Sequence, residues 1–128
     1  MSDIKALREK VKDLKVLFVE DEEDVRDGTS KFLKKFFINV TTCSNGAEGL
    51  DIFKKNRDFD VVITDVFMPV MSGVDMCRKI RKIDDKVFII FLTALKTSDK
   101  IKTEFSNVVL QKPLSFEDII PVMDKLTH

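Results

Sequence analysis

The hydrophobic residues of this chain gather in short uninterrupted runs that alternate with longer amphipathic stretches. The runs Val16–Val19, Val61–Ile63 and Val87–Leu92 are too short for helices and are rich in β-branched and aromatic residues, and the first two belong to the predicted strands Lys15–Val19 and Asp60–Thr64. Such runs are typical of strands that are buried on both faces, as in a parallel sheet covered by helices. Ile38–Thr42 and Asn107–Gln111 are less apolar. We expect these two strands to lie further out in the sheet.

Stretches with helical spacing of apolar residues separate these runs. They are Val25–Phe37, Gly46–Lys55, Val74–Lys82 and Ser115–Leu126. The last stretch begins with Ser115 and Asp118 at the spacing of a capping box, and Pro121 inside it predicts a kink or a later helix start. The alternation of strands and helices predicts an α/β fold, with a parallel sheet between two layers of helices and right-handed crossovers.

Composition narrows the class of protein. A chain of 128 residues fits one domain with a substantial core, and its 22 basic and 22 acidic residues create no overall field that would attract nucleic acid or an anionic membrane. No apolar run approaches the roughly 18 residues of a membrane span, and the charged N-terminus is unlike a signal peptide. Cys43 and Cys77 lack metal-ligand spacing, so we expect reduced, buried thiols and not a disulfide. Together these features predict a cytoplasmic protein that binds neither nucleic acid nor membranes.

Three carboxylates and one lysine stand directly after predicted strands. Glu20 and Asp21 follow the first strand, Asp65 follows the third, and Lys112 follows the fifth. Strand ends are where an open α/β sheet builds its sites. Grouped carboxylates suit a hard cation such as Mg²⁺, and a lysine supplies the positive charge that a phosphoryl group needs. The pattern predicts a metal-dependent phosphoryl site with one carboxylate available as nucleophile.

Between about Lys15 and Leu126, the chain resembles the receiver domain of two-component response regulators. The motifs that carry this resemblance are, in chain order, the pair Glu20-Asp21, the run Thr64-Asp65-Val66-Phe67-Met68-Pro69 with Ser72-Gly73, the run Phe91-Leu92-Thr93-Ala94, and Lys112-Pro113. The resemblance implies a flavodoxin-like, doubly wound sheet of five strands in the order 2-1-3-4-5, with helices on both faces. It also divides the chain into an N-terminal extension, residues 1–14, and a receiver domain, residues 15–128.

The resemblance implies a phosphorylation switch that depends on Mg²⁺, with Mn²⁺ as a substitute. Asp65 would be the nucleophile and would take phosphate from a sensor histidine kinase or a histidine phosphotransfer protein. Asp21 would bind the metal directly, Glu20 directly or through water, and the backbone carbonyl of Phe67 would complete the protein ligands. The chain would then be a signalling phospho-acceptor that assists its own phosphorylation and dephosphorylation, and not an enzyme. Its output partner is left open.

The resemblance also assigns the remaining site residues. Lys112 would pair with one phosphoryl oxygen and the hydroxyl of Thr93 with another, and the Lys112-Pro113 bond would be cis. Hydrolysis of the phosphate needs a water opposite Asp65, and Phe67 and Leu95 would flank its approach. Because neither side chain can orient a water by hydrogen bonding, we expect slow loss of the phosphate.

Two departures from the family pattern affect how a signal would spread. The chain between Thr93 and Lys112 is short, so we expect a small or distorted helix near Ser98–Phe105. Val109 stands where the family commonly carries Tyr or Phe. A valine cannot provide the aromatic rotation by which many relatives transmit activation, so the signal is expected to pass through Thr93 and the loop after it.

Ordinary structural interpretations stand beside these. A single strand-end acid is usually a turn residue, and Asp21 could simply favour the N-terminus of a helix. A receiver-like module that works without phosphorylation is an alternative function, although it would be expected to lack an acid or the lysine. An aspartate-nucleophile phosphatase is an alternative enzyme, and it usually carries a second Asp two residues after the nucleophile. Phe67 occupies that position here, which argues against this class. In the extension, Ile4, Leu7, Val11 and Leu14 have heptad-like spacing. Two heptads fall short of a coiled coil, so we favour a short helix that packs on its own domain or frays in solution over a partner or dimer contact.

Overall fold

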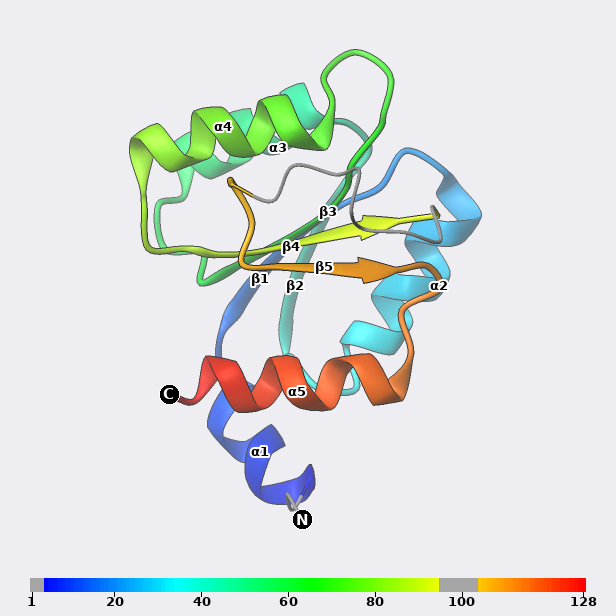
Figure 1. The fold of residues 1–128 in the computed structure, drawn as a ribbon, viewed down its shortest axis with the longest axis vertical. Coiled ribbons are helices and arrows are strands. Elements are labelled where there is room, and N and C mark those ends of the chain that lie inside the picture. Colours follow the sequence, from blue (N-terminus) through cyan, green and yellow to red (C-terminus); the bar gives the residue numbers. More distant parts are fainter. Residues whose placement is uncertain (1–3, 95–103) are drawn as a thin grey trace.

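The computed structural model describes residues 4–94 and 104–128, and they form a three-layer α/β fold (Figure 1). Five parallel strands make one sheet in the order β2-β1-β3-β4-β5, as predicted. The strands are β1 Lys15–Val19, β2 Asn39–Cys43, β3 Val61–Asp65, β4 Phe88–Thr93 and β5 Val108–Gln111. The helices are α1 Ile4–Val11, α2 Glu23–Leu33, α3 Gly46–Lys55, α4 Gly73–Ile83 and α5 Phe116–Leu126. The two less apolar strands, β2 and β5, lie at the edges of the sheet.

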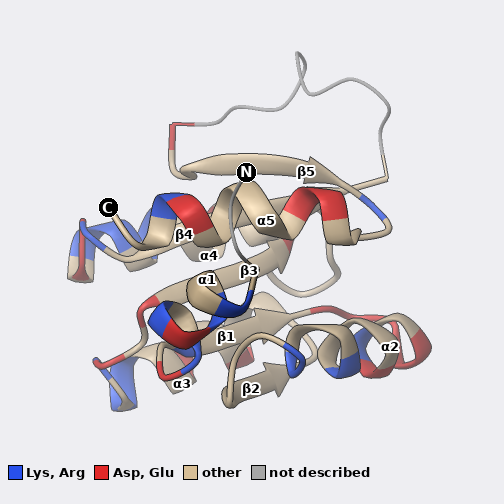
Figure 2. Cartoon of the chain, turned by 90° about the horizontal axis from the view of Figure 1, so that it is seen from below, with Lys and Arg blue, Asp and Glu red and all other residues tan. Residues whose placement is uncertain are grey.

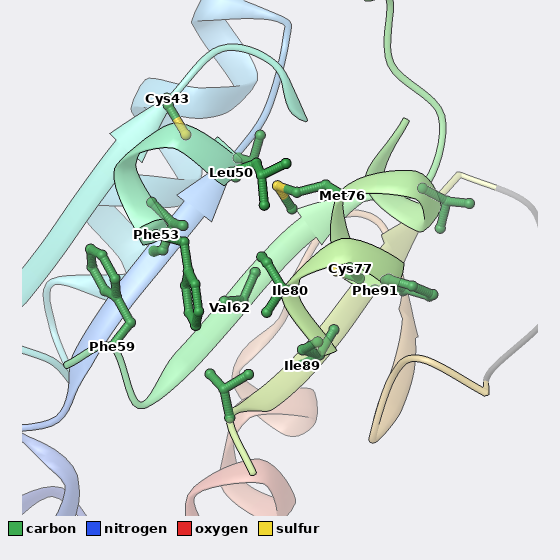
Figure 3. Close-up of a cluster of buried hydrophobic side chains, with 14 residues drawn as sticks. Cys43, Leu50, Phe53, Phe59, Val62, Met76, Cys77, Ile80, Ile89 and Phe91 are labelled. Atoms are coloured by element: carbon green, nitrogen blue, oxygen red, sulfur yellow. The ribbon is translucent and has the colours of Figure 1, made fainter. Parts of the chain in front are cut away.

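Alternate residues of the inner strands feed two hydrophobic clusters, because successive side chains of a strand point to opposite faces. On β1, Leu17 and Val19 belong to the cluster under α3 and α4, whereas Val16 and Phe18 belong to the cluster with α1, α2 and α5. Figure 3 shows the first cluster, in which side chains of α3 and α4 point toward the sheet. Cys43 and Cys77 lie in it as free, buried thiols, in agreement with the sequence. Strands buried on both faces explain the unbroken apolar runs.

Helix α2 ends earlier than its apolar pattern suggests. The helical stretch was predicted to reach Phe37, but α2 ends at Leu33. After it, the Lys35 and Phe36 N–H groups donate three residues back, to Phe32 and Leu33. After this tighter turn, Phe36 and Phe37 are both buried in the cluster with α1, α2 and α5.

Helix α5 begins where its capping box predicts. The Ser115 hydroxyl accepts from the backbone N–H of Asp118, and the Asp118 carboxylate accepts from the N–H of Ser115. The alternative of a later start caused by Pro121 is therefore wrong. Pro121 lies inside the helix on its exposed side, and burial of Ile119 and Met123 on the opposite side holds the helix in place.

Helix α1 packs against the same chain. Its Leu7 and Val11 are buried in the cluster that includes α5, and the Arg8 Nε donates to the Lys35 carbonyl at 2.7 Å. The predicted helix near Ser98–Phe105 lies almost entirely outside the described residues. In the described part of the chain, none of the helices has the length and apolar character needed to cross a membrane.

Candidate functional site

The ends of three neighbouring strands bring the predicted acids together. In the sheet β1 pairs with β3, with Val19 opposite Thr64, so the residues that follow β1 lie beside Asp65 at the end of β3. Glu20, Asp21 and Asp65 each offer a carboxylate oxygen, and these oxygens all lie within 4.8 Å of one another. Glu20 is buried, with 1% of its surface exposed, while Asp21 and Asp65 are half-buried. The cluster therefore opens to solvent on the side of Asp21 and Asp65.

Lys112 joins two of these acids. Its Nζ lies 2.6 Å from Glu20 Oε1 and 2.8 Å from Asp65 Oδ2. Its backbone N–H donates to the Thr93 carbonyl at 2.7 Å, which fixes the start of the segment that carries the lysine, and the peptide bond to Pro113 is cis. The sequence predicted a lysine close to Asp65, but it gave no sign that the same ammonium also pairs with Glu20.

The charges of the cluster are poorly balanced by protein groups alone. Burial raises the pKa of the Glu20 carboxyl above its usual range, although hydrogen bonds from Lys112 and from the Glu22 N–H oppose this shift. Burial acts to lower the pKa of Lys112, but its hydrogen bonds to Asp65 and Glu20 outweigh that effect and leave the pKa raised. The one ammonium therefore contacts two of the three carboxylates, Glu20 and Asp65. Grouped oxygen ligands of this kind fit a hard divalent cation such as Mg²⁺.

The loop after β3 is folded tightly against the site. The Gly73 N–H donates to the Val66 carbonyl at 2.9 Å, and a Cβ on Gly73 would lie 1.9 Å from the Asp65 carbonyl oxygen, so only glycine fits there. Between them, Met71 N–H donates to the Pro69 carbonyl across Val70, whose φ is 71°. This γ-turn holds a β-branched residue in a strained conformation.

The other predicted residues lie around the cluster. Thr93 is buried at the end of β4, directly after Leu92, which pairs with Asp65 in the sheet. Phe67 follows Asp65 by two residues and is 66% exposed, so its ring projects into solvent and not into the core. Leu95 lies outside the described residues.

One contact of the surroundings escaped the sequence interpretation. The guanidinium of Arg26, in the first turns of α2, donates to the backbone carbonyl of Glu20 at 2.9 Å. An arginine six residues after a strand-end acid has no periodic signature, because the contact crosses the junction between a strand and a helix. The N-terminal turn of α2 also carries Glu23 and Asp24, and this acidic end of the helix is red in Figure 2.

Comparison with known proteins places this site in a family context. A family model described as the response regulator receiver domain matches residues 16–124. The response regulator receiver protein CpdR of Brucella abortus is 29% identical over 115 residues, which cover 88% of this chain and 95% of that protein. Other curated relatives are longer, since the matched region spans 33% of one transcriptional regulatory protein and 50% of one response regulator.

Solved structures agree with the fold. A response regulator receiver domain protein from Clostridium thermocellum is 32% identical, with a TM-score of 0.78 and coverage of 89% of this chain and 94% of that one. The response regulator TrrA of Thermotoga maritima, in complex with Mg²⁺ and BeF, is 27% identical, with a TM-score of 0.77 and coverage of 88% and 98%. TrrA in complex with the histidine kinase ThkA matches with 26% identity, a TM-score of 0.77 and coverage of 90% and 99%.

Proposed function

Because this chain belongs to the response regulator receiver domain family, we propose that it is a phosphorylation switch whose phospho-acceptor is Asp65. The observation that carries the proposal is the pairing of Asp65 Oδ2 with Lys112 Nζ at 2.8 Å, inside a cluster of carboxylate oxygens within 4.8 Å of one another. Residues 15–128 would form the receiver domain, and residues 1–14 would be an N-terminal extension. The match of the family model to residues 16–124 supports this division.

Four residues would hold Mg²⁺ in this proposal. They are Glu20, Asp21, Asp65 and Phe67, the last through its backbone carbonyl. Mg²⁺, or Mn²⁺ in its place, would neutralise the grouped carboxylates and the oxygens of the incoming phosphoryl group. The crowding of three acids supports the assignment, because the single ammonium contacts only two of them and burial raises the pKa of Glu20 even with Lys112 in contact.

Asp65 would perform the transfer by attack of a carboxylate oxygen on phosphorus. A new bond from oxygen to phosphorus forms, the bond from phosphorus to the histidine nitrogen of the donor breaks, and its electron pair returns to the imidazole. Lys112 already lies against Asp65, so it is placed to pair with a phosphoryl oxygen once the carboxylate is phosphorylated. The hydroxyl of Thr93 would take another phosphoryl oxygen. Movement of the Thr93 hydroxyl toward the phosphoryl group would change the surface near the end of β4.

The donor would be a sensor histidine kinase or a histidine phosphotransfer protein. The match to TrrA in complex with a histidine kinase supports this class of partner. An apolar groove borders the site on the side of Lys112, and it is lined by Val25, Phe32, Pro113 and Leu114 among others. A partner bound in this groove would lie next to Lys112, which precedes Pro113. The output would be altered binding of a further protein by the changed surface.

We classify the chain as a signalling phospho-acceptor and not as an enzyme, although it would assist its own phosphorylation and dephosphorylation. The free thiols of Cys43 and Cys77 support a cytoplasmic location, where cysteines stay reduced. The alternative of a module that works without phosphorylation loses support because Asp65 and Lys112 are both present and in contact.

Intact mass spectrometry after treatment with acetyl phosphate tests the proposal. Wild type should gain one phosphate, which strong acid releases, in the presence of Mg²⁺ and little without it, and Asp65→Asn should gain none. Asp85→Asn is the matched control, because Asp85 is an exposed acid outside the cluster. Normal phosphate uptake by Asp65→Asn would overturn the assignment of the acceptor. No uptake by wild type would favour the module that works without phosphorylation.

A further inference from the structure

Arg26 joins the two ends of the loop that carries Asp21. Its guanidinium Nη1 donates to the Glu20 carbonyl at 2.9 Å, just after β1. Its backbone N–H donates to the Glu22 carbonyl at 2.8 Å, in the first turn of α2. One residue therefore links the end of the strand to the start of the helix, and Asp21 lies between these two attachment points.

Little else holds Asp21 in place. In residues 4–94 and 104–128, its side chain has no hydrogen bond or ion pair. Helix α2 also begins without a side-chain cap, since the N-cap residue Glu22 makes no such hydrogen bond. The remaining links are the Glu20 N–H to the Cys43 carbonyl and the Glu22 N–H to Glu20 Oε2, both at 3.1 Å. The position of Asp21 thus depends on its flanking backbone, and Arg26 supplies the one side-chain bond from α2 to that backbone among the described residues.

We propose that Arg26 is a positioning residue that orients Asp21 toward Mg²⁺ by fixing the end of β1 relative to α2. The inference rests on the proposed function, because Asp21 is a metal ligand only if the site binds Mg²⁺. Groups that orient metal ligands from outside the coordination shell typically change metal affinity by about 10–100-fold. The charge of Arg26 acts in the opposite direction, since a cation beside the cluster repels a divalent ion. The two roles of Arg26 therefore predict opposite changes when its guanidinium is removed.

Isothermal titration calorimetry of the full chain with MgCl₂, without any phosphodonor, separates these roles. We expect Arg26→Met to bind Mg²⁺ about tenfold more weakly than wild type. Arg26→Lys keeps a donor and the charge and should recover most of the affinity. Arg8→Met is the matched control, because Arg8 also donates to a backbone carbonyl, that of Lys35, but from α1 at the opposite edge of the sheet. It should bind Mg²⁺ as wild type does.

Each outcome decides the inference. Unchanged or tighter Mg²⁺ binding by folded Arg26→Met would overturn it, and so would equal weakening in Arg8→Met. If Arg26→Met does not fold by circular dichroism, the same comparison is made between Arg26→Lys and Arg26→Gln, with weaker binding expected for the glutamine. If wild type takes up phosphate and Arg26→Met binds Mg²⁺ normally, the role of Arg26 is refuted but the proposed function is not. Wild type that binds no Mg²⁺ would defeat the proposed function together with it.

Discussion

At the scale of single residues, Lys112 and Glu20 determine how the site behaves without a metal. Glu20 is buried at the end of β1 and would be an isolated charge if Lys112 Nζ did not lie 2.6 Å away. The same ammonium also contacts Asp65. In the proposed phosphorylated state, Lys112 would share its charge among more oxygens, and Glu20 would then depend more strongly on a bound cation. On this proposal, a metal would be needed before the site accepts phosphate.

Replacement of Glu20 tests this balance through pH. Burial raises the pKa of Glu20 above the ordinary value of 4.5, so the folded protein holds this proton to higher pH than the unfolded chain does. Between the unfolded and folded pKa values the native state binds more protons, and its stability therefore falls as pH rises. Glu20→Gln has no such titration. We expect the unfolding free energy of Glu20→Gln to rise relative to wild type as pH increases through this window, and then to level off.

Urea unfolding followed by far-UV circular dichroism, in metal-free buffer at several pH values, measures this difference. Fluorescence is unsuited because the chain contains no Trp and no Tyr. Glu48→Gln is the control, since Glu48 is an exposed acid on α3. A difference between Glu20→Gln and wild type that stays flat or shrinks with rising pH would contradict the expected role of burial.

Phe67 provides a second residue-scale prediction, which concerns the lifetime of the phosphorylated state. Its ring is 66% exposed two residues after Asp65 and cannot orient a water by hydrogen bonding. Phe67→Asn introduces a group that can, and general-base effects begin at about a hundredfold, so loss of phosphate should quicken by up to that factor. Val70→Asn is the control, because Val70 is an exposed apolar residue of the same loop. Phosphate loss in Phe67→Asn that equals wild type or is slower would refute the prediction.

At the scale of secondary-structure elements, the sequence was a better guide than it was to side-chain contacts. The strand runs were correctly located because each is apolar, short and ended by polar residues. The end of α2 was not, because Phe36 and Phe37 continue the apolar pattern beyond Leu33 although the chain has already turned. The contacts of Lys112 and Arg26 with Glu20 could not be predicted, since they join elements whose separation depends on the whole sheet.

Two glycines in helices, Gly28 and Gly49, should respond in opposite directions to replacement by alanine. Gly28 lies on the exposed side of α2, and a Cβ there would meet nothing within 4 Å. Gly49 lies in α3, where a Cβ would come within 2.8 Å of Met76 Sδ and 3.0 Å of Val19 Cγ2. Gly28→Ala should raise the unfolding free energy by about 1 kcal/mol, the difference in helix propensity. Gly49→Ala should lower it by roughly 1–3 kcal/mol through overpacking.

Urea unfolding of both variants measures these changes, and the opposite signs exclude a general effect of alanine. Gly28 also lines the groove beside Pro113. Phosphate uptake from acetyl phosphate should remain normal in Gly28→Ala. A loss of stability in Gly28→Ala would show that the glycine has a conformational role that the open space around it does not indicate.

At the scale of the whole molecule, the fold separates the candidate site from the packing of α1. The acids and Lys112 lie at the carboxyl ends of the strands, whereas α1 precedes β1 and packs at the other end of the molecule (Figure 1). The order of the strands followed from the resemblance and could not be read from hydrophobic pattern alone, because β-α alternation is shared by several doubly wound sheets. The burial of α1 was one of three alternatives that the sequence left open, beside a helix frayed in solution and a partner or dimer contact.

Removal of the main apolar contact of α1 tests this separation. Leu7 is 6% exposed in the cluster that includes α5, so Leu7→Ala should lower the unfolding free energy by about 2 kcal/mol, the lower end of such changes, because a helix near the chain terminus can relax. Phosphate uptake should be unchanged at temperatures where the variant is folded, since α1 does not contact the acidic cluster. Glu9→Ala, on the exposed side of α1, should change neither property. Sedimentation of wild type and Leu7→Ala at equal concentration completes the test. Unchanged stability together with loss of a dimer in Leu7→Ala would mean that Leu7 serves a contact between copies of the chain.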